Sequence, residues 1–249
     1  MVNPASAPER SLPDPERIVN NSGEVIALRF NVIPYLEQAI GHDWQETLVR
    51  VIHSGTVEQR RADGHVSNRE RGFNGVVELV TAGAEDLKTE VPGLWDLYLG
   101  PFKDMITEVL PEGSEPLKTY EHPEDALEGL AQIPVEQTGN ADVQRRMEAH
   151  IDGRYTGVLV VEAPEDSSQG GDLVIANSAD LNGVEEISKN ATRVHHIPGT
   201  LVCFVLGRKY PHFTEEITSG RRVIVSLNYP PEGETPEQAA QFREYIRSS

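Results

Sequence analysis

Three side chains that are able to bind a metal ion lie beside apolar runs in the second half of the sequence. His150 and Asp152 are one residue apart and precede the run "YTGVLVV", so on an extended chain both side chains point to the same face. Two polar groups at the entry of a buried strand need a common partner, because burying a charge without one is costly. His212, which opens the run "HFTEEIT", supplies a second imidazole. The three residues predict a metal site with two imidazole ligands and one carboxylate ligand.

A basic side chain follows the three predicted metal ligands in the sequence. Two imidazoles and a carboxylate leave one face of an octahedral ion open, as in non-heme Fe(II) oxygenases, although the spacing alone recurs by chance. Arg222 comes after His212, behind the turn residues "TSG". A dicarboxylate that chelates the metal through a keto acid needs such a guanidinium for its far carboxylate. On an ideal strand Arg222, Ser226 and Asn228 share one face, whereas Arg221 points outward. Ser226 could then add a hydroxyl to the same carboxylate, and Asn228 could face a substrate.

These residues together resemble the Fe(II)- and 2-oxoglutarate-dependent dioxygenases, in particular the prolyl-hydroxylase-like branch. The run "GGDLVIAN" resembles the "GGEL" strand of that branch, and "HHIPGTLVCFVLG" resembles its strand before the second histidine. The resemblance covers residues 130–229 in the right order. Residues before it match only in their general helical character.

The resemblance implies a fold and a set of ligands. The fold is mostly β with helical support, a double-stranded β-helix (jelly roll, cupin-like) with N-terminal helices packed on one sheet. His150, Asp152 and His212 would bind Fe(II), and Arg222 would bind the distal carboxylate of 2-oxoglutarate. Many relatives show Arg-x-Ser on the last strand, whereas here Ser226 stands four positions after Arg222. The role of Ser226 as a second 2-oxoglutarate ligand is therefore in doubt.

The implied activity is hydroxylation of a small molecule, such as an amino acid or a natural product, with release of succinate and CO2. O2 is the co-substrate and ascorbate an activator. Asp152 fills the position that related halogenases leave for chloride, which argues against chlorination. Desaturation, cyclisation and epimerisation stay open, as does hydroxylation of a prolyl or other protein side chain. A cupin-like protein that binds a metal without redox chemistry is the alternative of a different class, and it would have no reason for Arg222.

Other polar residues lie close to the predicted ligands in sequence. Gln132 precedes them on the run "LAQIPV" and could contact 2-oxoglutarate, whereas Arg154 and Tyr155 follow them and could contact the substrate. His195 and His196 are adjacent, so on a strand they point to opposite faces and cannot both bind one metal. We interpret these two histidines as a loop or edge pair.

The elements that position these residues divide the chain into a helical and a β part. We expect a flexible tail over 1–15 and a single domain over 16–249, with helices over about 31–112, a β core over about 115–230 and a last helix over about 235–247. A strand over Glu24–Phe30 should precede the first helix. The polar run Glu58–Gly75 reads as a loop: a solvated face, or a lid whose arginines close over an anionic substrate. These arginines are Arg60, Arg61, Arg69 and Arg71.

More local signals set the expected helix boundaries. Asn31 should cap a first helix that ends at Gly41, and a second helix should cover residues 44–56. The apolar stripe after residue 91 should be interrupted near Gly100 and Pro101. Trp95 and Tyr98, on that stripe, should belong to the core.

Composition limits the partners and the compartment. The formal net charge is −18, from 22 basic and 40 acidic side chains, which argues against nucleic acid and anionic membranes as main partners. Cys203 is the one cysteine, so no disulfide forms within the chain, and we expect a buried thiol. The sequence shows no secretory signal and no apolar run of membrane-spanning length. We therefore expect a cytoplasmic protein with a small-molecule substrate, and the oligomeric state stays open.

Overall fold

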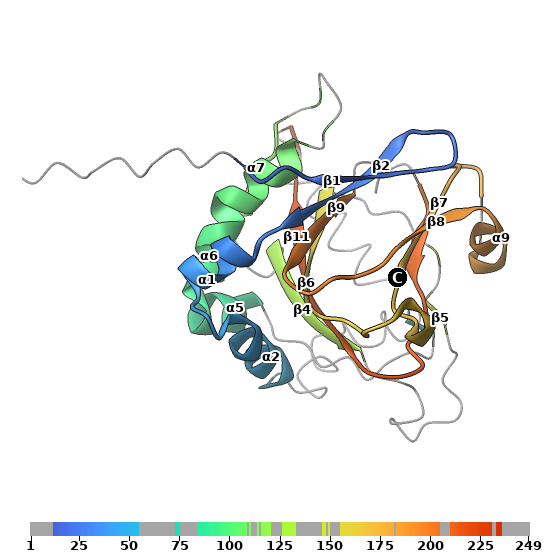
Figure 1. Ribbon diagram of the computed structural model, residues 1–249. Helices are drawn as coiled ribbons and strands as arrows, with labels where there is room; N and C mark the ends of the chain where they lie inside the picture. Colours follow the sequence, from blue (N-terminus) through green and yellow to red (C-terminus); the bar gives the residue numbers. More distant parts are fainter. Residues whose placement is uncertain are drawn as a thin grey trace, which may run out of the picture.

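Two β-sheets face each other, and helices cover the outer side of the larger sheet (Figure 1). The computed structural model describes residues 12–54, 73–74, 84–108, 110, 114, 116–120, 126–132, 146–147, 149, 155–181, 183–204, 210–230 and 233–235. Within these residues no helix is long and apolar enough to cross a membrane.

All the strand pairs of the sheets are antiparallel. The major sheet has the order β1 (Glu16–Val19), β2 (Val25–Asn31), β9 (Thr200–Phe204), β6 (Tyr155–Glu162), β11 (Arg222–Tyr229) and β4 (Leu127–Gln132). The minor sheet has the order β10 (His212–Thr214), β7 (Leu173–Ala176) and β8 (Ala191–Val194). A separate pair consists of β3 (Phe73–Asn74) and β5 (Arg146–Met147).

The strand β11 shows how the sequence builds two different faces of the major sheet. Its run "RVIVSLNY" is rich in β-branched residues, which favour a pleated strand, and successive side chains alternate between the faces. Val223 and Val225 pack in the apolar cluster under the helices. Ile224 packs in a second cluster, which contains residues of both sheets. Arg222 has the same parity as Ile224, so its side chain points between the sheets.

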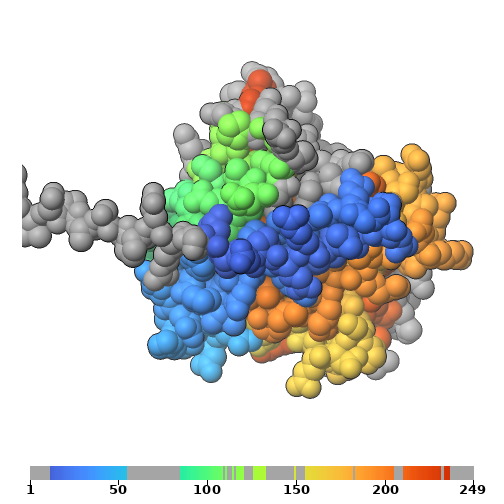
Figure 2. Space-filling view, turned by 45° about the horizontal axis from the view of Figure 1, so that its top comes forward, coloured from blue at the N-terminus to red at the C-terminus, as the bar shows by residue number. Residues whose placement is uncertain are grey.

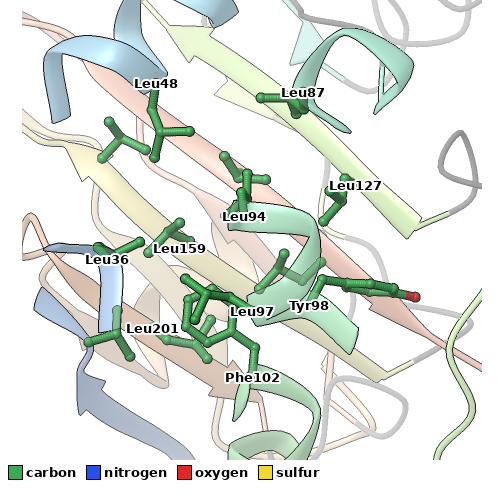
Figure 3. Close-up of a cluster of buried hydrophobic side chains, with 14 of the residues drawn as sticks. Leu36, Leu48, Leu87, Leu94, Leu97, Tyr98, Phe102, Leu127, Leu159 and Leu201 are labelled. Atoms are coloured by element: carbon green, nitrogen blue, oxygen red, sulfur yellow. The ribbon is translucent and has the colours of Figure 1, made fainter. Parts of the chain in front are cut away.

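The helices form a layer on the outer face of the major sheet, as Figure 1 shows. Figure 3 shows leucine and aromatic side chains from the helices and the sheet meeting in one cluster, where each large buried side chain contributes about 1.5–3 kcal/mol. The helices of this layer are α1 (Ile33–Ala39), α2 (Trp44–Ser54), α5 (Ala84–Glu90), α6 (Pro92–Leu99) and α7 (Pro101–Thr107). A further helix, α9 (Val184–Lys189), contributes Ile187 to a small cluster with β7 and β10 on the minor sheet.

The N-terminal hairpin extends the major sheet. In Figure 2, β1 and β2 lie in dark blue across the surface, next to the orange region that contains β9. Residues 27–31 of β2 pair with residues 200–204 of β9. The edge strand β1, which begins directly after the tail predicted over 1–15, was not predicted from the sequence.

Most predicted elements are confirmed, with a correction at the first helix. Its N-cap is Val32 rather than Asn31, which is the last residue of β2. The Asn31 side-chain oxygen still accepts a hydrogen bond from the Ile33 amide at 3.1 Å. Asn31 therefore satisfies an amide of the first helical turn, although it lies one residue before the N-cap. The second helix begins at Trp44, and the apolar stripe is interrupted at Gly100, as predicted.

Several predictions fall outside the described residues. These are residues 1–11 of the tail predicted over 1–15, most of the loop Glu58–Gly75 with its four arginines, and the last helix beyond residue 235. Within the loop run, Phe73–Asn74 is a short strand, which the absence of any periodicity had not indicated. Cys203 is buried, as expected, and burial raises the pKa of its thiol.

Candidate functional site

A buried cation marks the start of β11. Arg222 is only 3% exposed, and it lies opposite Gln132 of β4 in the strand register. Its Nη1 donates to Gln132 Oε1 at 2.7 Å, and its Nε lies 3.0 Å from His196 Nδ1. Burial lowers the pKa of Arg222 to about 9, so the guanidinium is still charged at neutral pH.

The hydrogen-bond partners of this charge among the described residues are neutral. Among the described residues, no carboxylate forms an ion pair with Arg222; its partners are the Gln132 amide and the His196 imidazole. A buried charge without a counter-ion is costly, and the cost is offset when an anion binds. An anion bound at the start of β11 would therefore offset the buried charge.

The adjacent arginine has the opposite environment. Arg221 has a 45% exposed side chain and pairs with Glu162 on the neighbouring strand β6. Its Nη2 donates to Glu162 Oε1 at 2.7 Å, and its Nε lies close to Glu162 Oε2. The prediction that Arg221 points outward and Arg222 inward is confirmed.

His212, the first residue of β10, points between the two sheets. It pairs with Ile175, a residue of the cluster between the sheets, and it is 5% exposed. The Phe204 ring stacks on the imidazole with 5.2 Å between the ring centroids. His212 Nδ1 lies 3.4 Å from the Tyr210 carbonyl oxygen. A ring hydrogen bond to a backbone carbonyl is a common way in which proteins orient a metal-binding histidine.

The other two predicted metal ligands, His150 and Asp152, lie outside the described residues, as does Arg154. The short strand β5, which ends at Met147 a few residues earlier in the sequence, contacts β10, the strand that begins with His212. Within the described residues alone, no three His, Cys, Asp or Glu side chains gather to hold a metal. A metal site formed by His150, Asp152 and His212 therefore stays a prediction.

The other described residues that were predicted for the site lie at some distance from Arg222 or on the other face of the sheet. Ser226 and Asn228 have the parity of Arg222 and are half-buried, and Asn228 Oδ1 accepts from Thr156 Oγ1 at 3.3 Å. Ser226 lies four strand positions from Arg222, about 13 Å along β11, which is too far to share one carboxylate with it. Tyr155 packs against the cluster under the helices, so the structure does not bring it to the Arg222 side of the sheet.

The sequence reading missed His196. It lies with His195 in the connection from β8 to β9, as a loop pair should, and the two rings occupy different environments. His195 is 34% exposed, and its Nδ1 lies 2.8 Å from Asp172 Oδ1 and 3.0 Å from Ser167 Oγ. His196 is 1% exposed and contacts Arg222. Parity predicted opposite faces, but no local signal shows which of the two rings is buried.

Burial and the nearby cation set the charge of His196. Its pKa is held well below the usual value, first by burial and then by the charge of Arg222, so the imidazole is neutral at pH 7. The backbone of the "GGD" run reaches the ring, because the Gly171 carbonyl oxygen lies 2.9 Å from His196 Nδ1. A glycine is required just before it: at Gly170, φ is 79°, and an added Cβ would come within 1.7 Å of the Glu216 carbonyl oxygen.

Sequence comparison and structure comparison give different results. The sequence matches no protein-family model and no curated protein. The structure is similar to a prolyl hydroxylase from Trichoplax adhaerens, solved with a peptide fragment of the hypoxia inducible factor oxygen degradation domain. The TM-score is 0.50 and the identity 12%, over 86% of each chain.

A second solved structure gives the same degree of similarity. AviO1 from Streptomyces viridochromogenes Tue57 has a TM-score of 0.50 and 12% identity, over 85% of this chain and 92% of its own. HygX from Streptomyces hygroscopicus, solved with nickel, 2-oxoglutarate and hygromycin B, is more distant, with a TM-score of 0.45 and 14% identity over 84% of each chain. The chain thus has the fold of the Fe(II)- and 2-oxoglutarate-dependent oxygenases, the jelly roll with helical support that the sequence predicted.

Proposed function

We propose that the protein is an Fe(II)- and 2-oxoglutarate-dependent dioxygenase that hydroxylates a small molecule, with release of succinate and CO2. One observation carries the proposal. Arg222 is a buried cation whose described partners are neutral, and the sequence resemblance assigns this arginine to the distal carboxylate of 2-oxoglutarate.

The residues around Arg222 fit a dicarboxylate. A guanidinium binds a carboxylate through charge-assisted hydrogen bonds, which are about twice as strong as neutral ones. Gln132 Oε1 holds one end of the guanidinium, and His196 lies at its Nε, so Nη2 is left for the ligand among the described contacts. The bound dianion would replace the hydration that Arg222 lost on folding.

The residues that would hold the metal are His212, His150 and Asp152. Contacts with Phe204 and with the Tyr210 carbonyl hold the His212 ring between the two sheets. The contact of β5 with β10 supports the approach of the His150 segment to His212. When bound, Fe(II) and 2-oxoglutarate supply the activation of O2 that hydroxylation of a C–H bond requires.

The side chains of the protein would bind and orient the ligands and keep water out of the site. The cluster between the sheets includes Ile224, Val158 and Val202, which make this side of the major sheet largely apolar. In such an environment each polar contact with a ligand is stronger than in water. Asn228 and Thr156, farther along β11 and β6, place polar groups where a substrate could contact them.

A second candidate is hydroxylation of a prolyl or other side chain of a protein. The Trichoplax adhaerens prolyl hydroxylase, solved with a peptide, shares the fold over 86% of both chains and favours this candidate. A metal-binding protein without redox chemistry is disfavoured, because it gives no role to the buried charge of Arg222. Screening free amino acids, natural products and proline peptides for stimulation of succinate release would separate the first two candidates.

Succinate release is the direct test of the proposed activity. With Fe(II), ascorbate, 2-oxoglutarate and O2, the wild-type protein should release succinate slowly even without substrate. His150→Ala and His212→Ala should each abolish this release and weaken Fe(II) binding. His42→Ala is the matched control, because the His42 side chain is 93% exposed. A wild-type protein that binds Fe(II) but forms no succinate would instead support the non-redox alternative.

A further inference from the structure

His196 has two neighbours competing for a single ring nitrogen. Its Nδ1 lies 3.0 Å from Arg222 Nε, which can only donate, and 2.9 Å from the Gly171 carbonyl oxygen, which can only accept. A neutral imidazole carries its one proton on Nδ1 or on Nε2, so Nδ1 cannot satisfy both neighbours. The position of this proton decides what the rest of the ring can bind.

The charge of Arg222 decides the competition. A proton on His196 Nδ1 would face the N–H of a buried cation, so two positive groups would meet and Arg222 Nε would have no acceptor. A proton on Nε2 leaves Nδ1 as the acceptor of a charge-assisted hydrogen bond, which is the stronger of the two contacts. The geometry therefore favours the tautomer with the proton on Nε2.

In that tautomer Nε2–H is a buried donor that needs an acceptor. Within the described part of the chain, His196 Nε2 has no hydrogen-bond partner although it is shielded from solvent. An unsatisfied buried donor costs about 1–3 kcal/mol, so such groups usually have a partner in the functional state of a protein. Because the ring itself contacts Arg222, the carboxylate of a ligand bound to Arg222 is a candidate for this acceptor.

We propose that His196 is a further binding residue of the 2-oxoglutarate site: Arg222 fixes its neutral tautomer, and its Nε2–H donates to the distal carboxylate. The inference rests on the proposed function, since it takes the dicarboxylate at Arg222 as its ligand. Arg222 supplies the charge, Gln132 holds the guanidinium, and His196 adds a directional neutral donor. It thereby replaces the hydroxyl that Ser226 is too distant to provide.

Two substitutions at His196 distinguish the roles of its two ring nitrogens. His196→Asn keeps an acceptor oxygen near the position of Nδ1 and removes the donor at Nε2. His196→Gln keeps an amide donor near the position of Nε2 and removes the acceptor for Arg222. If His196 only oriented Arg222, the glutamine variant would be the more damaging one. The proposal predicts the reverse order for the affinity of the protein for 2-oxoglutarate.

The affinity is measured by calorimetry on the Zn²⁺-loaded protein, which does not turn over. His196→Asn should weaken 2-oxoglutarate binding about tenfold, the effect of losing one good hydrogen bond to a charged group. The same variant should bind 2-oxopentanoate, which has a methyl group in place of the distal carboxylate, within twofold of wild type. His196→Asn with unchanged affinity for 2-oxoglutarate, or with equal losses for both ligands, would overturn the inference.

A measurement on the wild-type protein keeps the test valid if a variant does not fold. Long-range 1H–15N spectra of the 15N-histidine-labelled, Zn²⁺-loaded protein report the tautomer of each imidazole. His196 should carry its proton on Nε2, and that proton signal should shift when 2-oxoglutarate is added but not with 2-oxopentanoate. A His196 with its proton on Nδ1 in the bound protein contradicts the inference.

The failure of this inference is distinguishable from that of the proposed function. If 2-oxoglutarate does not bind the metal-loaded wild-type protein, both fall. If it binds, and Arg222→Met weakens it while His196→Asn does not, the dioxygenase proposal stands and only the role of His196 is lost.

Discussion

The two faces of β11 place stability and chemistry on opposite sides of one strand. The face toward the helices carries Val223, Val225, Leu227 and Tyr229, all fully buried among apolar side chains. The face toward the minor sheet begins with the charge of Arg222. Because side chains alternate along a strand, one short run can serve both purposes. A change on one face should affect mainly the unfolding free energy, and a change on the other mainly ligand binding.

The largest effect on stability is expected on the helix face. Leu227→Ala removes a fully buried side chain and should lower the free energy of unfolding by about 2–5 kcal/mol. The affinity of the folded protein for 2-oxoglutarate should stay within twofold of wild type. Chemical denaturation and calorimetry on the same sample check both values. A folded Leu227→Ala protein that loses 2-oxoglutarate affinity would show that the two faces are coupled.

The charge of Arg222 makes binding depend on pH. Because burial lowers its pKa to about 9, the cation that binds the carboxylate is lost as the pH rises through this value. The affinity for 2-oxoglutarate should therefore fall about tenfold between pH 8 and pH 10, while both ligand carboxylates stay ionised. Titrations at several pH values check this fall, and an affinity that stays constant up to pH 10 would contradict it.

Rising pH has the opposite effect on the stability of the ligand-free protein: it weakens ligand binding but raises the contribution of Arg222 to the free energy of unfolding. The folded state releases the Arg222 proton at lower pH than the unfolded state does, so between about pH 9 and 12 the unfolded state binds more protons. This group alone should then make unfolding less favourable as the pH rises. Comparing the pH dependence of unfolding of wild type and Arg222→Met isolates the contribution.

The smallest effect is expected at Ser226, on the same face as Arg222. Ser226→Ala should change 2-oxoglutarate affinity less than twofold, because the hydroxyl lies about 13 Å along the strand from Arg222. Since Ser226 is only half-buried, stability should change by no more than about 0.5 kcal/mol. A tenfold loss of affinity would show that Ser226 binds 2-oxoglutarate, and it would contradict the assignment of this role to His196.

The alternation of β11 was readable from the sequence, and so was the inward direction of Arg222. The same parity argument separated Arg222 from Arg221, whose pairing with Glu162 confirms the prediction. The contact between His196 and Arg222 was not readable, because it joins the β8–β9 connection to the start of β11. Only the packing of the two sheets brings these positions together.

Short elements were missed for a related reason. The strands β1 and β8 have four residues each, and α9 has six, too few for a period to stand out. Their positions are fixed by pairing and packing: β1 against β2, β8 against β7, and α9 on β7. The long runs β6 and β11 carry enough β-branched residues to be recognised alone.

The central claim is that Arg222 is the anchor of an organic dicarboxylate, and Arg221 provides its internal control. Calorimetry of 2-oxoglutarate binding to the Zn²⁺-loaded protein should show a loss of about a hundredfold for Arg222→Met, because a buried charge-assisted contact is worth about 2–5 kcal/mol. Arg221→Met, which removes an exposed pair with Glu162, should bind within twofold of wild type. Equal affinities for the two variants, or a loss confined to Arg221→Met, would contradict the account.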